Sequence, residues 1–262
     1  ALGAPAVAKT TRGGYDGKGQ AVLRGAEDAD GAWNALGAPE LLVEAWAGFE
    51  AELSVIVARG RAGDLEVYGP MRNVHVDHIL DQVTFPAGFG SRIEEGAREL
   101  GRRTAEALDL TGVCCIEMFL MPSGQILINE IAPRPHNSGH LTIEAHHSSQ
   151  FDQQARAMAG LPLGSARPRV PSAAMVNLLG RHLPEDEAPH PWRAAHGVRG
   201  AVVHLYGKDR PVPGRKMGHV TATGTASHEA LAAARETREA LTPHGDKRTK
   251  PKQKLSRWRP RY

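Results

Sequence analysis

The pattern of apolar and polar residues along the chain predicts a mixture of strands and helices. Alternating or short apolar runs bounded by turn residues predict strands at Ala6–Lys9, Gln20–Arg24, Leu41–Trp46, Leu53–Arg59, Val113–Met121, Gln125–Ile131, Ala173–Leu179, Val198–Tyr206 and Gly218–Thr223. Longer amphipathic segments predict helices at Ala26–Leu36, Ser91–Leu108, Ser149–Ala159 and Glu229–Leu241. The stretch around His75 is rich in turn residues and is expected to form turns. Because strands and helices do not alternate strictly, we expect an α+β fold rather than a doubly wound parallel sheet.

The composition is that of an ordinary globular protein. With 262 residues, 41% hydrophobic and 23% charged, the chain can bury one large core or two moderate ones. No apolar run approaches the roughly 20 residues that cross a bilayer, and the start of the chain lacks the features of a secretion signal. We therefore expect a cytoplasmic protein without membrane contacts. The two cysteines, Cys114 and Cys115, are adjacent, which disfavours a disulfide between them and indicates a buried strand.

The formal charge of +3 hides an uneven distribution. Residues 243–262 carry eight lysines and arginines against one aspartate, a net +7, so the rest of the chain carries −4. Such a tail could contact RNA or acidic lipid. Solvated charge at a chain end is the more common case, and a nucleic-acid partner is not expected.

A glycine-dense segment lies between the first two predicted strands. Residues 13–19 read Gly-Gly-Tyr-Asp-Gly-Lys-Gly, and Lys9 precedes them. Glycines allow backbone N–H groups to converge on phosphate oxygens, and lysines supply positive charge for the same anion. The segment is not a Walker loop, because the Gly-Lys-Ser/Thr ending before a helix is missing. The pattern fits a phosphate-binding loop, and it also fits a flexible hairpin tip.

Two glutamates carry a sharper signal. If Pro122–Gln125 form an even-length hairpin loop, Glu117 and Glu130 lie directly opposite each other on neighbouring strands. Like charges at that separation are destabilising unless one is protonated or a cation lies between them. Mg²⁺ suits such a pair, since it takes one or two protein carboxylates and completes its shell with phosphate and water. A register shift by one residue would separate the pair.

Three further segments carry candidate binding groups. Pro133–His140 is a proline-restricted stretch that presents a guanidinium, imidazoles and an amide, which suits a small anion or a phosphate. Glu44 ends an apolar strand and Glu52 begins the next one. Backbone groups of such a strand edge could line a nucleotide base, while one carboxylate accepts hydrogen bonds from the ribose hydroxyls. Lys208 and the turn Pro213–His219 gather positive charge for a phosphorylated substrate. The alternatives are a structural loop for the first segment, exposed acids at strand ends for the second, and solvated surface charge for the third.

Together, these segments resemble the 5-(carboxyamino)imidazole ribonucleotide synthetases, which are ATP-grasp enzymes of purine biosynthesis. The resemblance extends from about Ala1 to at least Thr223, and NEIAPRPHNSGH at Asn129–His140 is its most specific stretch. The other matching stretches are RGGYDGKGQ (Arg12–Gln20), ELSVIVAR (Glu52–Arg59), NVHVDHILD (Asn73–Asp81), SQFDQQARAMAGLPLG (Ser149–Gly164), NLLG (Asn177–Gly180) and YGK with PGRKMGHV (Tyr206–Val220).

The resemblance implies an ATP-grasp fold, in which ATP lies between two α+β subdomains, followed by a small β-rich C-terminal region. The implied units are a lid subdomain at 1–60, a larger subdomain with the metal site at 61–165, a region completing the substrate site at 166–242 and the basic tail at 243–262. The implied reaction is a two-step ligation that uses ATP and Mg²⁺. ATP phosphorylates bicarbonate to carboxyphosphate, and the carboxyl group then passes to the amine of 5-aminoimidazole ribonucleotide.

The resemblance also assigns roles to residues. Glu117 and Glu130 would bind magnesium. The residues expected at ATP are Lys9, Gly14, Tyr15, Asp16, Gly17, Lys18, Gly19, Gln20, Glu44, Ala45, Trp46, Glu52, His75, Asn129 and Glu130. Those expected around the ribonucleotide are Tyr15, Asp16, Lys18, Lys208 and Arg215. Catalysis by fixed donors and charges is assigned to Arg134, His136, Asn137 and Lys208. Strict strand alternation would point Asn129 to the opposite face from Glu130.

The family also has a Rossmann-like N-terminal domain and is expected to form homodimers. The resemblance begins after that domain, so we expect it to be missing from this chain. Two other interpretations stay open. One is a different ATP-grasp carboxylase or transformylase, such as a formate-dependent glycinamide ribonucleotide transformylase or a biotin carboxylase. The other is a truncated, non-catalytic nucleotide-binding fragment.

Overall fold

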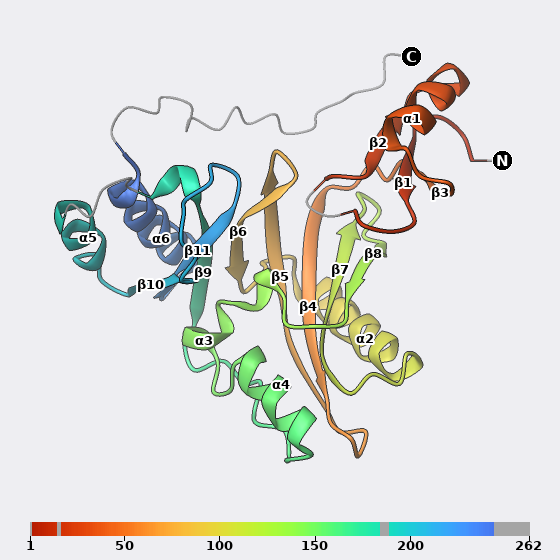
Figure 1. Ribbon diagram of the computed structural model, residues 1–262. Helices are drawn as coiled ribbons and strands as arrows, with labels where there is room; N and C mark the ends of the chain where they lie inside the picture. The colour runs from red at the N-terminus through yellow and green to blue at the C-terminus, as the bar shows by residue number, and fades with distance from the viewer. Residues whose placement is uncertain (1, 15–16, 184–188, 244–262) are drawn as a thin grey trace.

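The chain folds around two antiparallel sheets (Figure 1). A computed structural model describes residues 2–14, 17–183 and 189–243. The small sheet has the strand order β2-β1-β3, and the large sheet has the order β10-β11-β9-β6-β5-β4-β7-β8. The strands are β1 (Ala6–Thr10), β2 (Gln20–Leu23), β3 (Leu41–Ala45), β4 (Ala51–Arg59), β5 (Leu65–Val76), β6 (Ile79–Phe85), β7 (Gly112–Leu120), β8 (Ile126–Ala132), β9 (Ser172–Leu179), β10 (Ala201–Leu205) and β11 (Lys216–Gly224). This arrangement confirms the α+β prediction.

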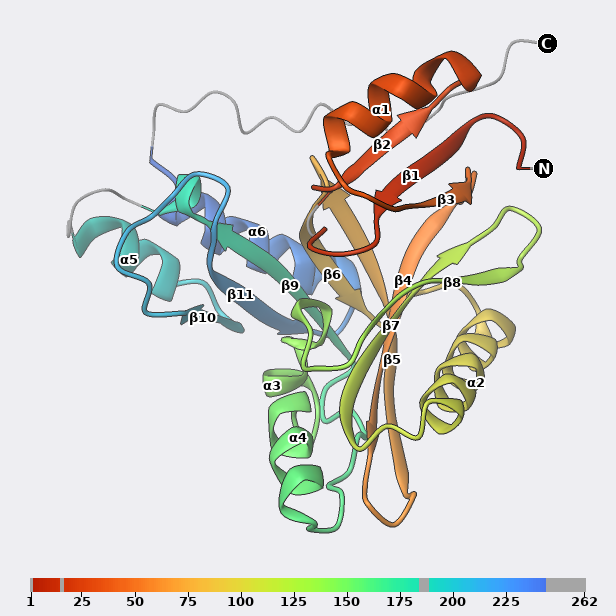
Figure 2. The ribbon, with the colours of Figure 1, turned by 45° about the vertical axis from the view of Figure 1, so that its right-hand side comes forward.

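Helix α1 (Ala29–Leu36) packs against the small sheet, and the other helices lie on the two sides of the large sheet. These are α2 (Ser91–Ala107), α3 (Thr142–Ala145), α4 (Gln150–Ala159), α5 (Pro189–His196) and α6 (Ser227–Leu241), with short 3₁₀ turns η1 (Ala26–Asp28), η2 (Asn137–Gly139) and η3 (Gly180–His182). Figure 2 shows α2 on one side of β4, β5 and β7, with α3 and α4 on the other. Among the described residues, no helix combines the length and apolarity needed to cross a bilayer.

One region departs from the sequence-based expectation. The stretch around His75 forms two long strands, β5 and β6, rather than turns. The residues that suggested turns are real local features: Gly69 has a positive φ, and Asp77 and His78 form a left-handed turn with φ values of 50° and 65°. Ladder pairing with β4 on one side and β9 on the other overrides these local signals and places this hairpin in the middle of the sheet.

Sheet membership also differs from the expected grouping. The strand expected at Leu53–Arg59 was placed with the first unit, but β4 pairs with β5 and β7 in the large sheet. Only β1, β2 and β3 form the small sheet, which lies beyond one end of β4 in both ribbon views. Likewise, β9 pairs with β6, so β9, β10 and β11 continue the large sheet rather than forming a sheet of their own.

The core is divided by the large sheet. One cluster packs β4 and β7 against α2, while Cys115, Ile56 and Tyr68 belong to a second cluster on the other face. A third cluster joins β9 and β11 to α6. Cys114 and Cys115 are buried, unpaired neighbours on β7, as the sequence predicts, and they belong to different clusters because strand side chains alternate.

Helix α2 approaches β4 closely because its buried positions are small. Ile93, Ala97, Gly101 and Ala105 recur every fourth residue and form one face of the helix. A methyl group at Gly101 would lie 2.4 Å from Cγ2 of Val55, whereas one at Gly96 on the same helix would lie 3.5 Å from Ile126. The helix-to-sheet distance is therefore set at Gly101.

The variant Gly101→Ala should lower the free energy of unfolding by about 1–2 kcal/mol, since overpacking outweighs the gain in helix propensity. The control Gly96→Ala should raise it by about 0.5–1 kcal/mol, since the added methyl group meets no close neighbour. Urea denaturation of both variants measures the difference. Stabilisation by Gly101→Ala equal to that of the control would contradict the close packing.

Three histidines are buried in the neutral form. Burial, with neighbouring arginines, lowers the pKa of His146 and His182 from 6.5 to about 4. Burial and the neighbouring histidines lower the pKa of His219 to about 2. In the unfolded chain these groups bind protons near pH 6.5, so the folded state loses stability as pH falls below that value.

Each of these histidines should cost about 1 kcal/mol of stability between pH 7.5 and pH 5.5. Urea denaturation at the two pH values measures the total loss. His146→Gln should reduce the difference between the two pH values by about 1 kcal/mol, because its side chain no longer titrates in this range. An unchanged difference would show that His146 is charged in the folded state.

Candidate active site

The predicted glutamate pair is present in the ladder. Glu117 on β7 lies directly opposite Glu130 on the edge strand β8. The Glu117 side chain is half-buried, with 15% of its surface exposed, while Glu130 is exposed. Directly opposite residues on neighbouring strands have Cβ atoms about 5 Å apart, so both carboxylates can reach one cation.

The route to this register differs from the one inferred from the loop. Near the hairpin turn, Leu120 pairs with Ile126 and Met118 with Ile128, one residue out of step with the Glu117–Glu130 pair. The loop is therefore of odd length, and the even-length expectation was wrong. A β-bulge between these pairs leaves Asn129 as the extra residue and restores the register at Glu130. The bulge also breaks strict alternation at Asn129, which removes the reason to place it on the opposite face.

The electrostatics around Glu117 are those of crowded acids. Burial raises the pKa of the Glu117 carboxyl, and the nearby Glu130 and Glu52 raise it further, while His75 and Lys216 act in the opposite direction. A divalent cation would remove the same repulsion and favour the ionised carboxylate. The half-buried Glu117 and the exposed Glu130 thus fit a Mg²⁺ ion.

The adjacent strands β4 and β5 add a second acidic position. Glu52 pairs with Phe119 of β7, and its Oε2 lies 2.5 Å from Nδ1 of His75. Burial lowers the pKa of His75, but the hydrogen bond and the charge of Glu52 outweigh it, so the net shift is upward. Glu52 and His75, which were predicted separately for the ATP site, therefore form one ion pair beside Glu117.

The glycine-dense loop contacts this region. A Cβ at Gly17 would lie 2.4 Å from Cβ of His78, at the tip of the β5–β6 hairpin that carries His75. Gly17 has a φ of 77°, so a side chain there would be strained as well as obstructed. Gly14 and Gly19 complete the turn, and Gln20 pairs with Lys9. Tyr15 and Asp16 lie outside the described residues, as does the basic tail from residue 244.

The small sheet brings the other predicted nucleotide residues together. Lys9 Nζ lies 2.6 Å from Oε2 of Glu44, across the β1–β3 ladder. Because β3 is an edge strand, the backbone groups on its outer side are available to a planar ligand near Ala45. Trp46 follows directly, 44% exposed, with its backbone N–H donated to Pro5.

The loop after β8 forms a rigid corner. His136 Nε2 lies 3.7 Å from Oε1 of Glu117, and Asn137 donates from Nδ2 to Oδ1 of Asn177 at 3.1 Å. Oδ1 of Asn137 is buried and has no hydrogen-bond partner among the described residues. Arg134 is exposed and its side chain donates to the carbonyl of Pro135. The corner thus places the imidazole of His136 next to Glu117, with the guanidinium of Arg134 and the amide of Asn137 on the same loop.

A buried glutamine holds this corner in place. Gln150 accepts from the backbone N–H of His136 at 2.9 Å and donates to its carbonyl at 2.7 Å. A Cβ at Gly139 would lie 2.4 Å from Oε1 of Gln150, so only glycine permits this approach. Burial, with the charges of Arg134 and Lys216, lowers the pKa of His136 to about 3, and the imidazole is neutral at pH 7.

The predicted phosphate-binding residues lie on the β10–β11 connection. Lys208 donates from Nζ to the carbonyl of Lys216 at 2.6 Å, and burial together with the charges of Arg215 and Lys216 lowers its pKa. Arg215 is exposed. The charge of Lys216, the first residue of β11, lowers the pKa values of Glu117, His136 and Lys208, so it acts on both the acidic pair and this turn.

The sequence reasoning missed several groups of the site. Lys216 belonged to the basic turn that was noted, yet only Arg215 was singled out. Gln150 and Cys115 gave no local signal, because a buried glutamine and a strand cysteine both read as ordinary structural residues. The stretch Ser149–Gly164 contains a predicted helix and carries part of the resemblance, but no role in the site is expected of it, although Gln150 binds the backbone of His136.

Comparison with known protein families agrees with this geometry. The ATP-grasp domain family matches residues 1–151, and the phosphoribosylaminoimidazole carboxylase C-terminal domain matches residues 173–233. The chain is 42% identical over 217 residues to N5-carboxyaminoimidazole ribonucleotide synthase of Bacillus subtilis (strain 168), an alignment that covers 83% of this chain and 56% of that protein.

Solved structures give the same picture. An ADP complex of N5-carboxyaminoimidazole ribonucleotide synthetase superposes with a TM-score of 0.82 at 41% identity, over 91% of this chain and 62% of that one. The Aspergillus clavatus synthase in complex with ADP and 5-aminoimidazole ribonucleotide gives 0.81 at 35% identity, over 92% and 63%. The chain thus spans about three-fifths of the length of these relatives. It belongs to the ATP-grasp family and, within it, to the family of the N5-carboxyaminoimidazole ribonucleotide synthases.

Proposed function

We propose that this chain provides the ATP-binding and carboxylating site of an N5-carboxyaminoimidazole ribonucleotide synthase. The observation that carries the proposal is Glu117 opposite Glu130, beside the corner of His136 and Asn137 and the basic turn of Lys208. The reaction has two steps. A bicarbonate oxygen attacks the γ-phosphorus of ATP and ADP leaves, and the amine of 5-aminoimidazole ribonucleotide then attacks the carboxyl carbon of carboxyphosphate and phosphate leaves.

Glu117 and Glu130 would hold Mg²⁺, which supplies charge neutralisation on the ATP phosphates when it is bound. The raised pKa of Glu117 supports this assignment, since burial and neighbouring acids disfavour the ionised carboxylate and a bound cation would favour it. Asn129 could also face this site, because the bulge interrupts the alternation of side chains along β8 at this residue.

The nucleotide would lie between the small sheet and the β4–β5 edge of the large sheet. Lys9 and the loop Gly14–Gln20 would contact the phosphates, with Glu44 to Trp46 along the adenine. Glu52 would accept the ribose hydroxyls, held in position by His75 at 2.5 Å. The contact between Gly17 and His78 supports this placement, because it brings the glycine loop over the strand that carries His75.

Arg134, His136 and Asn137 would surround bicarbonate and then carboxyphosphate. The Arg134 guanidinium would stabilise the negative charge that develops on the transferred group. The amide of Asn137 is held by its hydrogen bond to Asn177, and its buried Oδ1 has no hydrogen-bond partner among the described residues. Gln150 keeps the corner in one conformation, so little reorganisation is needed during the reaction.

The phosphate of the ribonucleotide would bind Lys208 and Arg215, and Tyr15, Asp16 and Lys18 would also contact this substrate. Exclusion of water by the glycine-dense loop would protect carboxyphosphate from hydrolysis. We further propose that the intact protein is a homodimer, as the family resemblance implies.

The direct test is phosphate release from ATP by the purified chain. The proposal predicts that release requires both bicarbonate and 5-aminoimidazole ribonucleotide. Stimulation by formate and glycinamide ribonucleotide instead would assign the chain to a transformylase. ATP binding with no response to either substrate pair would identify a non-catalytic nucleotide-binding fragment.

The variant Glu130→Gln should reduce magnesium-dependent phosphate release at least about 100-fold, because it removes one carboxylate of the cation site and leaves the fold intact. Circular dichroism checks the fold. Glu99→Gln, on the exposed face of α2 with 60% of its side chain accessible, is the matched control and should retain full activity. Full activity of Glu130→Gln would exclude its role as a magnesium ligand.

Replacing Lys208 by Met or Arg215 by Gln should raise KM for the ribonucleotide roughly tenfold each, since one charged hydrogen bond to the phosphate is lost. The KM for ATP should change less than that for the ribonucleotide. Arg210→Gln, exposed on the same connection, serves as the control. If KM for the ribonucleotide is unchanged in both variants, neither residue binds its phosphate.

A further inference from the structure

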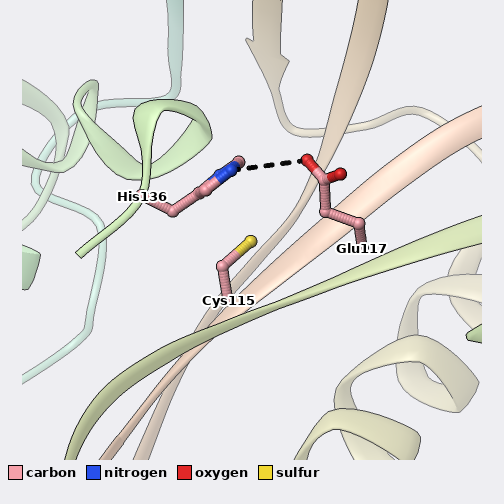
Figure 3. Close-up of side chains that lie close together, drawn as sticks. All are labelled: Cys115, Glu117 and His136. Atoms are coloured by element: carbon pink, nitrogen blue, oxygen red, sulfur yellow. Dashed lines mark ion pairs between the residues drawn. The ribbon is translucent and has the colours of Figure 1, made fainter. Parts of the chain in front are cut away.

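Three side chains of different chemical kind converge beside the proposed magnesium site (Figure 3). Cys115 and Glu117 lie two residues apart on β7, so they point to the same face of the sheet, and His136 reaches them from the loop after β8. Their sulfur, oxygen and nitrogen atoms all lie within 4.8 Å of one another. The Glu117–His136 separation is 3.7 Å. The role proposed for Glu117 and His136 in the reaction makes no use of Cys115.

We propose that Cys115, Glu117 and His136 form a binding site for a zinc-type divalent cation, distinct in its ligands from the magnesium site and sharing Glu117 with it. The site goes beyond the proposed function, because it involves a metal of a different chemical class and a residue outside the carboxylation chemistry.

The ligand set favours zinc over magnesium. Mg²⁺ requires oxygen ligands in near-octahedral geometry, whereas Zn²⁺ binds thiolate sulfur, imidazole nitrogen and carboxylate oxygen in a tetrahedron. Three protein ligands with a fourth position open to water is a common zinc arrangement. Affinity for such mixed ligands also rises along the first-row series and is far higher for zinc than for magnesium.

The geometry is close to that required. Zinc bonds of about 2.0–2.3 Å in a tetrahedron separate neighbouring ligand atoms by about 3.3–3.6 Å. The Glu117–His136 pair at 3.7 Å already meets this condition. Even at the 4.8 Å limit, the sulfur would need to move by only about 1 Å, which a small side-chain rotation provides.

The ring of His136 can present a free electron pair to the metal. The imidazole is neutral at pH 7, since burial lowers its pKa to about 3. Its Nδ1 accepts the backbone N–H of Ser138 at 3.3 Å and lies 3.0 Å from the Ser138 hydroxyl. Metal binding through Nε2, the atom that faces Glu117, requires the ring proton to move to Nδ1, where the Ser138 hydroxyl can accept it in place of the backbone contact.

The thiol of Cys115 becomes a ligand only when a metal arrives. Burial raises the pKa of Cys115, so the free side chain is a neutral thiol. On binding, the S–H proton passes to solvent and the S–Zn bond forms. The thiolate and the Glu117 carboxylate then balance the two charges of the ion. The positive charges of Arg134 and Lys216 near His136 are opposed by the neighbouring Glu130 and Glu52.

Cobalt is the probe for this site, because Co²⁺ takes zinc positions and its bonds to sulfur give a near-ultraviolet charge-transfer band. Titration of the purified chain should give this band, saturating at about one equivalent, and Zn²⁺ should abolish it by displacement. The chain has only two cysteines, so the band can arise from Cys114 or Cys115 alone.

Cys115→Ala should lose the band, whereas Cys114→Ala should keep it with affinity within about twofold, because Cys114 packs in the α2-facing cluster. His136→Gln leaves both thiols in place and should weaken cobalt binding at least about tenfold. No band in the unmodified chain, or a band that survives in Cys115→Ala and is lost in Cys114→Ala, would overturn the proposal.

These measurements do not depend on carboxylation. A cobalt band without bicarbonate-dependent phosphate release would support the zinc-type site and contradict the proposed function, and the converse result would do the opposite. If both hold, Zn²⁺ should inhibit phosphate release, and Cys115→Ala should make the reaction at least about tenfold less sensitive to Zn²⁺.

Discussion

The site depends on one unfavourable contact, the approach of two carboxylates across the β7–β8 ladder. Glu117 and Glu130 are directly opposite, and burial with neighbouring acids raises the pKa of Glu117. An uncompensated pair of this kind would weaken the edge strand β8. Compensation comes from the cations around it: His75, Lys216 and, when bound, a metal ion. The arrangement of segments around the large sheet can be understood as the means of bringing these positive groups to the acids.

Those groups arrive from parts of the chain that are far apart in sequence. His75 comes with the β5–β6 hairpin, His136 with the loop clamped by Gln150, and Lys216 with the start of β11. Because all these strands belong to one sheet, the C-terminal strands cannot be separated from the Glu117–Glu130 pair without breaking the β6–β9 pairing. The two families that match the chain, at 1–151 and 173–233, therefore meet in a single structural unit.

The sequence predicted the parts of the site that depend on local pattern. The α+β class, the buried adjacent cysteines and the Glu117–Glu130 pairing are confirmed, and His136 of the stretch Asn129–His140 lies 3.7 Å from Glu117. The pairing was predicted for the wrong reason, because the loop has an odd length. The bulge at Asn129 restores the register that an even loop would give. A bulge has no clear sequence signal, because it is set by how two strands pair rather than by the residues of either one.

What could not be predicted is non-local. Strand β5 contains glycine, proline and asparagine, and only the pairing of β5 with β4 and of β6 with β9 shows that the two strands are central. The role of Gln150 depends on an approach to Gly139 across a turn, and that of Lys216 on the path of the C-terminal strands. In each case the deciding interaction joins residues that no short window contains, so tertiary pairing overrides local propensity.

The burial of each side chain also determines which metal ion it can bind. Because side chains alternate along a strand, Cys115 points to the same face of the sheet as Glu117. Cys115 is the more deeply buried of the two. A carboxylate at that depth would add a third buried charge, whereas a thiol stays neutral because burial raises its pKa. Magnesium, which does not bind neutral sulfur, therefore meets only oxygen ligands. A softer ion can displace the proton and use the sulfur, so selectivity follows from burial as much as from residue type.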